Sequence, residues 1–269
     1  MLKGLITFRR RSRLLLGALA LAVAGLAGAP AAQAADPLAY PESQSWSWTG
    51  PFGLFDRGQV QRGFKVYREA CQACHGLDLL AFRNLGQPGG PEFSEDEVRA
   101  IAADHQIEDG PDRQGDMFMR PGSAADRFPS PYPNEEAARA VNMGSYPPDL
   151  SVIAKARHGG ADYLYSLLTG YRDPPPDFVL QDGLHFNPYF PGGQIAMAPP
   201  LGDGFIEYTD GTPETLENYA RDVSAFLMWA AEPKMEERKR LGFQVMIFLF
   251  AFAGLLYLSK RKLWRDVEH

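Results

Sequence analysis

The chain has 269 residues, of which 45% are hydrophobic and 22% charged, and its formal net charge at pH 7 is -6. These proportions are typical of a folded globular protein and exclude disorder over most of the length. The acidic balance argues against a nucleic-acid partner, which would require a basic face for the phosphates. Two cysteines are too few for a disulfide framework.

The N-terminal segment has the organisation of a secretory signal peptide. Basic residues from Lys3 to Arg13 precede an apolar stretch at 14–26, and Ala32-Gln33-Ala34 has the small residues of a cleavage site. An uncleaved anchor is the alternative, but the apolar stretch is shorter than the roughly 20 residues that a membrane span needs. We therefore expect residues 1–34 to be removed and the mature chain to begin at Ala35.

A helix is predicted before the first cysteine. Val60, Phe64, Tyr67 and Cys71 recur at spacings of three and four residues, which places them on one helical face. Gly63 lies beside that face and lacks a side chain, so a second helix could approach closely there.

The two cysteines form the sequence Cys71-Gln-Ala-Cys74-His75, a C-x-x-C-H motif. In this motif both thiols add to the vinyl groups of a haem, and the adjacent histidine binds the iron. A dithiol redox site would need a thioredoxin-like context, and a zinc site would need two further ligands at short spacing. The sequence has neither, so we expect one covalently attached haem c.

The segment after the motif is strongly acidic. Between Glu92 and Met117 there are nine acidic residues and two basic ones, and no clear helical or strand period runs from 92 to 132. We expect the stretch at 92–117 to be loop-like. It is either a solvated surface or a docking surface that steers a cationic partner by long-range electrostatics.

A second iron ligand is expected among the eight methionines. The methionines in the signal peptide, the acidic segment and the C-terminal helices are in unsuitable places for an iron ligand, which leaves Met143 and Met197. Met197 lies in an apolar, proline-bounded loop at 191–201, between the motif and the last helix of the domain, and is favoured. Three histidines are weaker candidates: His105, His158 and His185.

The domain is expected to end in an amphipathic helix. Thr212 could cap it and Pro213 could begin it, and apolar residues then follow a period of three to four until Glu232-Pro233. Together with the helix before the motif, it resembles the crossing terminal helices of class I cytochromes c.

A membrane span is predicted near the C-terminus, because residues 241–258 contain no charge and are long enough to cross most of a bilayer. Basic residues on both sides do not orient it. The signal peptide does, which gives an exported domain at 35–233, a basic membrane-proximal linker at 234–240 and a cytoplasmic tail at 259–269.

The chain from about Trp46 to Trp264 resembles the cytochrome c1 family, the haem subunits of quinol:cytochrome c reductases. The segments that carry this resemblance are Phe55–Gly58, Gln61–Tyr67, the C-x-x-C-H motif, Tyr146–Ser151, Ala156–Gly160, Asp162–Tyr163, Ser166–Tyr171, Phe186–Pro191, Met197–Pro200 and Asp210–Pro213. The resemblance implies a mostly α fold: a class I cytochrome c-like haem domain with loop insertions and one C-terminal transmembrane helix.

The resemblance also implies roles for individual residues. His75 and Met197 would be the axial ligands, Arg157 would lie near a haem propionate, Tyr163 would lie in the haem pocket, and the turn containing Pro148 would line the histidine side.

The function implied is electron transfer from a Rieske iron-sulfur protein to a soluble, basic cytochrome c, with cytochrome b as the membrane partner. The haem domain would lie on the periplasmic side of a bacterial cytoplasmic (inner) membrane, and the chain would have no substrate site of its own. One alternative is a membrane-anchored cytochrome c that donates electrons to a terminal oxidase. Another is a haem enzyme such as a peroxidase, which would need an iron site open to substrate.

Overall fold

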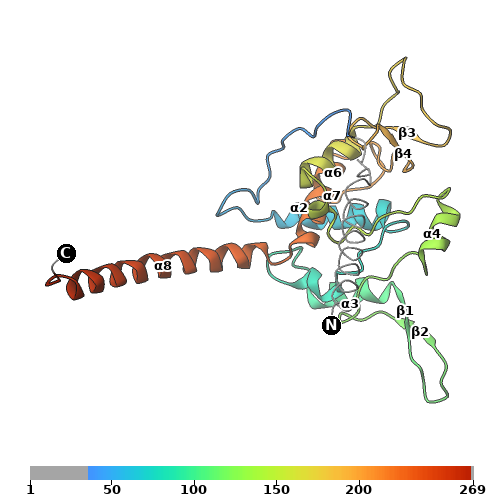
Figure 1. The fold of residues 1–269 in the computed structure, drawn as a ribbon. Coiled ribbons are helices and arrows are strands. Elements are labelled where there is room, and N and C mark those ends of the chain that lie inside the picture. Colours follow the sequence, from blue (N-terminus) through green and yellow to red (C-terminus); the bar gives the residue numbers. More distant parts are fainter. Residues whose placement is uncertain (1–35, 268–269) are drawn as a thin grey trace, which may run out of the picture. The chain divides into compact units, whose positions relative to one another are not determined.

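The computed structural model describes residues 36–267, so the expected signal peptide at 1–34 lies outside the described residues. The described chain is mostly helical with two short β-hairpins, which confirms the predicted fold class (Figure 1). The helices are α2 (Arg57–Val66), the π-helix η1 (Tyr67–Cys71), the 3-10 helix η2 (Phe82–Gly86), α3 (Glu95–Ala103), α4 (Glu135–Val141), α5 (Ile153–Ala156), α6 (Gly160–Thr169), α7 (Leu216–Ala231) and α8 (Met235–Leu263). The antiparallel pairs are β1 (Gln106–Asp109) with β2 (Phe118–Pro121) and β3 (His185–Phe186) with β4 (Gln194–Ile195).

The predicted pair of terminal helices is formed by α2 and α7, which pack directly against each other. The Asp56 side chain caps α2 by accepting a hydrogen bond from the amide of Gln59 at 2.9 Å. The crossing is so close that a Cβ atom added to Gly63 would lie 2.0 Å from the carbonyl oxygen of Asp222. The expectation for Gly63 is therefore confirmed.

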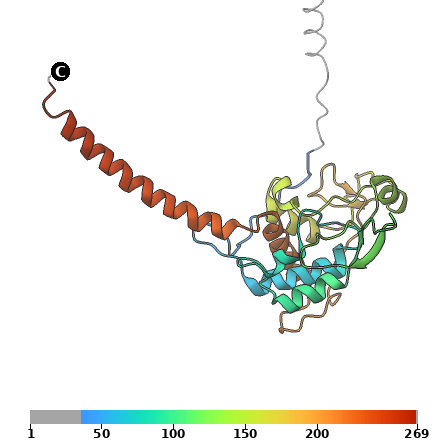
Figure 2. The same ribbon diagram turned by 90° about the horizontal axis from the view of Figure 1, so that it is seen from below.

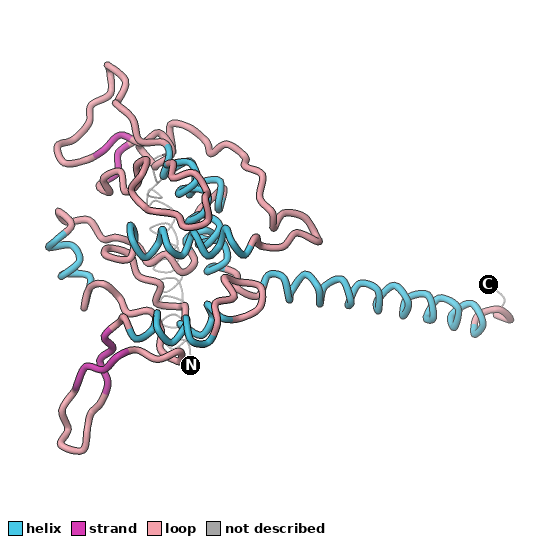
Figure 3. Tube along the Cα trace, turned by 180° about the vertical axis from the view of Figure 1, so that it is seen from behind, coloured by secondary structure: helices cyan, strands magenta, loops and turns pink. Residues whose placement is uncertain are grey.

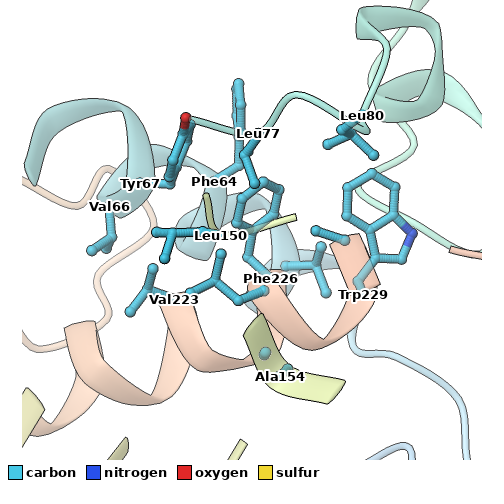
Figure 4. Packing of buried hydrophobic residues seen from close by; sticks show 14 of the residues in the cluster. Phe64, Val66, Tyr67, Leu77, Leu80, Leu150, Ala154, Val223, Phe226 and Trp229 are labelled. Atoms are coloured by element: carbon cyan, nitrogen blue, oxygen red, sulfur yellow. The ribbon is translucent and has the colours of Figure 1, made fainter. Parts of the chain in front are cut away.

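Aromatic side chains fill the space around this crossing (Figure 4). The ring of Phe226 in α7 lies 5.5 Å from that of Phe64 and 5.7 Å from that of Tyr67, and all three residues are buried. Leu77 and Leu150 belong to the same cluster. The core therefore reaches from the helix pair to the segments on either side of the C-x-x-C-H motif.

Helix α7 begins at Leu216, three residues later than the predicted start at Thr212-Pro213. The Thr215 hydroxyl accepts a hydrogen bond from the amide of Asn218 and caps the helix. Thr212 instead donates its amide to the Asp210 carboxylate, in a turn that precedes the helix. The predicted end of the helix near Glu232-Pro233 is confirmed.

The expectation of a loop-like stretch at 92–117 is wrong, because it contains α3 and β1, the first strand of the β1–β2 hairpin (Figure 3). Ser94 and Glu97 form a capping box that starts α3. In the hairpin, the Arg120 side chain is paired with the carboxylates of Asp109 and Asp126. Local hydrogen bonds therefore order a segment that has little apolar periodicity.

Helix α8 contains the predicted membrane span, with a mean hydropathy of 2.2 in its most apolar part, none of which is buried within the described chain. Figure 2 shows α8 as one continuous helix that follows α7. Residues 235–240, expected as part of a linker, are its first turns. Met235, the first residue of α8, is packed against the domain and only 2% exposed.

Two side chains at the start of α8 fasten it to the segment before α2. The Glu236 carboxylate accepts two hydrogen bonds from the Arg57 guanidinium, at 2.7 and 2.8 Å, and a third from the amide of Phe55 at 2.8 Å. The Lys239 ammonium donates to the carbonyl oxygens of Trp48 and Gly53. The first turns of α8 therefore belong structurally to the domain.

A domain fragment that ends after Arg240 should be more stable than one that ends after Pro233. The shorter fragment loses the buried Met235 side chain, worth roughly 1.5–3 kcal/mol, and the partly screened Arg57–Glu236 pair, worth about 1 kcal/mol. We expect the free energy of unfolding to differ by about 2–4 kcal/mol. Urea unfolding followed by tryptophan fluorescence measures it, and equal midpoints would contradict the anchoring role of these turns.

Candidate functional site

The C-x-x-C-H motif follows a change in helix geometry. Helix α2 passes into one turn of π-helix, in which the amide of Gln72 donates to the carbonyl of Tyr67 at 2.9 Å. The amides of Cys74 and His75 then both donate to the carbonyl of Cys71, at 3.1 and 2.9 Å. The two cysteines and the histidine are thus held in one tight turn at the end of the helix, and π-turns of this kind are frequent at functional sites.

His75 is held by the segment that contains Pro148. Its Nδ1 atom lies 2.8 Å from the carbonyl oxygen of Pro148. A carbonyl can only accept, so Nδ1 carries the proton and Nε2 keeps the lone pair that a metal would use. The hydroxyl of Tyr67 donates to the His75 carbonyl at 2.9 Å and fixes the backbone as well.

Burial sets the protonation states in this turn. It lowers the pKa of His75 below the ordinary histidine value, although the Pro148 carbonyl acts in the opposite direction. It raises the pKa of the Cys71 thiol to about 12, with a further contribution from Cys74. Since dithiol oxidoreductases need a lowered thiol pKa, the dithiol alternative is disfavoured, while a neutral imidazole is the form that binds metals.

Asp149 braces the two segments that meet at His75, a role that could not be assigned from the sequence. Its carboxylate accepts hydrogen bonds from the amides of Asp78 and Ser151, both at 2.8 Å. The amide of Leu150 donates to the carbonyl of Gly76 at 2.9 Å. An acidic residue after a Pro-Pro pair is typical of a turn, but only the fold reveals its distant partner.

Met197 lies between β4 and α7 and is half-buried. Its carbonyl accepts a hydrogen bond from the Tyr171 hydroxyl at 3.1 Å. The alternative ligand, Met143, is 76% exposed and has a positive φ of 51° in a turn after α4. Two further methionines of the acidic segment, Met117 and Met119, are also mostly exposed.

Arg157 and Tyr163 lie on the Met197 side of the site. Tyr163 in α6 is 8% exposed, and against the effect of burial the exposed Arg157 guanidinium acts to lower its pKa. Burial raises the pKa of Tyr163 and, more strongly, that of Tyr171, with Tyr163 adding to the effect on Tyr171. Of these three side chains, that of Tyr171 reaches Met197 directly, through the hydrogen bond to its backbone carbonyl.

The predicted site residues thus fall into two groups: Cys71, Cys74, His75 and Pro148, and Arg157, Tyr163 and Met197. Among the described residues, no hydrogen bond or ion pair joins the groups directly. They share one hydrophobic core, in which Tyr67 and Leu150 border the first group and Tyr163 belongs to the second.

Two cavities flank the motif. One of about 260 Å³ is bordered by Cys74, Gly76, Tyr146 and Pro147, and another of about 360 Å³ by Tyr67 and the residues between the two cysteines. Within residues 36–267, no cluster of three or more His, Cys, Asp or Glu side chains could hold a metal ion. A metal bound to such side chains, as in a zinc site, therefore lacks ligands there. A c-type haem, in contrast, fits the two thiols, the available Nε2 of His75 and the thioether of Met197.

The sequence matches the model of the Cytochrome C1 family over residues 46–267. It is 46% identical to cytochrome c1 of Rhodospirillum rubrum, over 93% of this chain and 97% of that protein. It is 49% identical to the mitochondrial heme protein cytochrome c1 of Saccharomyces cerevisiae, over 89% of this chain and 77% of that protein. It is also 51% identical to cytochrome b/c1 of Bradyrhizobium diazoefficiens over 84% of this chain, but it spans only 36% of that longer protein.

Proposed function

The chain belongs to the Cytochrome C1 family, and from this membership we propose that it is the haem subunit of a bc1 complex and carries one haem c. The observation that carries the proposal is the family match, which includes the C-x-x-C-H turn as well as α8. We propose thioether bonds from Cys71 and Cys74 and axial ligation by His75 and Met197.

When bound, a haem c of this type supplies reversible one-electron exchange at its iron. His75 would bind through Nε2, and its Nδ1–H bond to the Pro148 carbonyl would fix the ring orientation. Met197 would supply a soft thioether, which favours the ferrous state and raises the potential. With His75 and Met197 both holding the iron, the chain would transfer electrons and would leave no position at the iron for a substrate.

Arg157 and Tyr163 would act at the rim of the site. A guanidinium forms strong paired hydrogen bonds with a carboxylate, so the exposed Arg157 would be placed to bind a haem propionate. Tyr163 would remain as a buried wall that excludes water from the Met197 side.

The proposed electron path leads from a Rieske iron-sulfur protein to this chain and from it to a soluble cytochrome c. Cytochrome b is the proposed membrane partner, and the name cytochrome b/c1 of the Bradyrhizobium relative supports that choice. Catalysis would belong to the assembly rather than to this chain.

The proposed topology is that of an exported, single-pass protein of a bacterial inner membrane. Residues 1–34 would be removed, the domain that follows would lie in the periplasm, and the tail from 259 would lie in the cytoplasm. The continuous helix α8 supports a single span, and the bacterial relatives support this location.

Purification of the full-length chain in mild detergent, through a tag after His269, tests the function. We expect a b-type cytochrome and a Rieske protein to co-purify, because the haem subunit is held in the assembly. Subunit composition by mass spectrometry and haem content by redox difference spectra measure this. Co-purification with a terminal oxidase instead would favour the alternative of a membrane-anchored donor.

Fewer carboxylates of the acidic segment are available to a basic acceptor than its composition indicates. Four of its carboxylates are paired with arginines: Glu92 with Arg57, Asp96 with Arg99, Asp104 with Arg68, and Asp109 with Arg120. Glu97 is part of the capping box of α3. It is exposed, and hydrogen bonds from Ser94 lower the pKa of its carboxyl group. Asp112 accepts hydrogen bonds from the amides of its own turn, while Glu95, Glu108 and Asp116 are exposed and available to a partner.

Neutralising Glu95, Glu108 and Asp116 together to Gln, Gln and Asn should slow association with a basic cytochrome c roughly 3- to 10-fold at low ionic strength. The difference should shrink as the Debye length approaches about 8 Å near physiological salt. Stopped-flow rates against salt concentration measure it, and Glu97 is kept so that α3 stays capped. If rate and salt slope match the unmodified protein while the potential is unchanged, the docking surface lies elsewhere, for example around Glu207 and Glu217.

A further inference from the structure

The loop Trp48–Phe55, which precedes α2, exposes two large apolar side chains. Phe52 is 74% exposed and Leu54 is 56% exposed. The two ends of the loop are buried: Trp48 and Phe55 are 6% and 4% exposed, and their rings lie 5.2 Å apart in the core. The loop is therefore anchored at its base and apolar at its tip.

The tip conformation is built into the loop. The Thr49 hydroxyl donates to the carbonyl of Trp46 at 2.8 Å. Gly50 has a φ of +74°, and the chain folds back so closely that a Cβ on Gly53 would lie 2.1 Å from the carbonyl oxygen of Thr49. The exposure of Phe52 is thus a feature of a tight, hydrogen-bonded turn.

The same loop is fastened to the start of α8. The Lys239 ammonium donates to the carbonyl oxygens of Trp48 and Gly53, at 2.5 and 3.0 Å. The ring of Phe52 meets that of Phe243 edge-on, with centroids 5.7 Å apart. Phe243 is the third residue of the apolar run 241–258, so Phe52 lies beside the helix where it changes from basic to apolar.

We propose that the Trp48–Phe55 loop is a second membrane contact, in which Phe52 and Leu54 insert among the phospholipids beside α8. The inference rests on the proposal that α8 spans the membrane. Aromatic side chains favour the interfacial zone, and an exposed apolar patch that continues a membrane span is naturally covered by lipid. Lys239 also favours a lipid contact. Its ammonium binds the loop carbonyls and holds the loop at the level of the lipid headgroups.

A second membrane contact would fix the orientation of the domain. A single helix would let the domain tilt and rotate above the membrane, whereas α8 and the loop form two contacts joined by Lys239 and Glu236. Two contacts fix the tilt of the domain, and with it the direction in which the C-x-x-C-H turn faces its redox partners.

Photo-cross-linking of the full-length, haem-loaded chain in nanodiscs of a single phosphatidylcholine tests the loop. Phe52→p-benzoylphenylalanine should give, after irradiation, an adduct with the mass of one phospholipid. The matched control is Phe205→p-benzoylphenylalanine, since Phe205 is 67% exposed but lies before α7, at the end of that helix away from α8. Its lipid adduct should be at least tenfold less abundant.

Leu249→p-benzoylphenylalanine, in the middle of α8, separates this inference from the proposed span. A lipid adduct at Leu249 with none at Phe52 overturns the loop contact alone, while no adduct at Leu249 overturns the span. The same Phe52 variant in native membranes should also give the lipid adduct. A cross-link from Phe52 to another protein subunit there would overturn the proposal and assign the loop to a protein interface.

Discussion

Replacing Met197 with lysine should lower the midpoint potential of the attached haem by roughly 200–400 mV, within the range of about 0.8 V over which axial ligands set haem potentials. A nitrogen donor stabilises ferric iron, whereas the thioether that it replaces stabilises ferrous iron. The two cysteines are unchanged, so the haem should stay attached. At 59 mV per tenfold change for one electron, a fall of about 300 mV would disfavour reduction by the proposed Rieske partner by about five powers of ten.

Met143→Lys is the matched control for this experiment. Met143 is 76% exposed and already has a positive φ, so the same substitution there adds no burial cost and no new backbone strain. Its potential should stay within a few tens of millivolts of the unmodified protein, on the order of the effect of one exposed charge. Potentiometric titration of both variants decides between the ligands. A low potential for Met143→Lys with a normal one for Met197→Lys would reverse the assignment.

The features that the sequence predicted well are those encoded by neighbouring residues. Cys71, Cys74 and His75 lie within five positions, and the uncharged run at 241–258 is continuous. The face of Val60, Phe64 and Tyr67 follows from helical periodicity alone, and its burial against α7 is confirmed. Each of these signals needs no knowledge of the rest of the chain.

The features that were missed depend on residues far apart in the chain or on competition between local hydrogen bonds. Asp149 braces a segment about 70 residues earlier, and Lys239 reaches carbonyl oxygens near residue 50. Thr212 and Thr215 are both reasonable helix caps, and the Asp210 turn decides between them. The capping box at Ser94 and Glu97 could have been read from the sequence, because S-x-x-E before a helical segment is a start signal.

The crossing of α2 and α7 gives the second large expected effect, since Gly63→Ala should destabilise the domain by about 2–4 kcal/mol. In a helix open to solvent the same change would stabilise by up to about 1 kcal/mol, because alanine is the better helix former. Here the new methyl group would lie 2.0 Å from the Asp222 carbonyl oxygen and 2.7 Å from Cβ of Phe226. Both neighbours are parts of a buried helix and cannot move independently.

Gly58→Ala provides the control within the same helix. A Cβ at Gly58 would meet only the side-chain ends of Asp56 and Arg62, at 3.5 and 3.6 Å, which are ordinary contacts. We therefore expect Gly58→Ala to be neutral or slightly stabilising, while Gly63→Ala lowers the thermal midpoint by roughly 5–15 °C for a domain of this size. Urea and thermal unfolding of both variants measure the difference.

The displacement of α2 by the Gly63→Ala substitution should also affect the proposed haem site. To relieve the clash, α2 must move away from α7, and the contact of Tyr67 with Phe226 must open with it. Tyr67 donates the hydrogen bond that fixes the backbone of His75, so the displacement would be transmitted to the proposed iron ligand. Gly63→Ala should therefore shift the haem potential as well as the unfolding midpoint, whereas Gly58→Ala should change neither by much. Equal stabilities for the two variants would mean that the helices are not held in this close crossing.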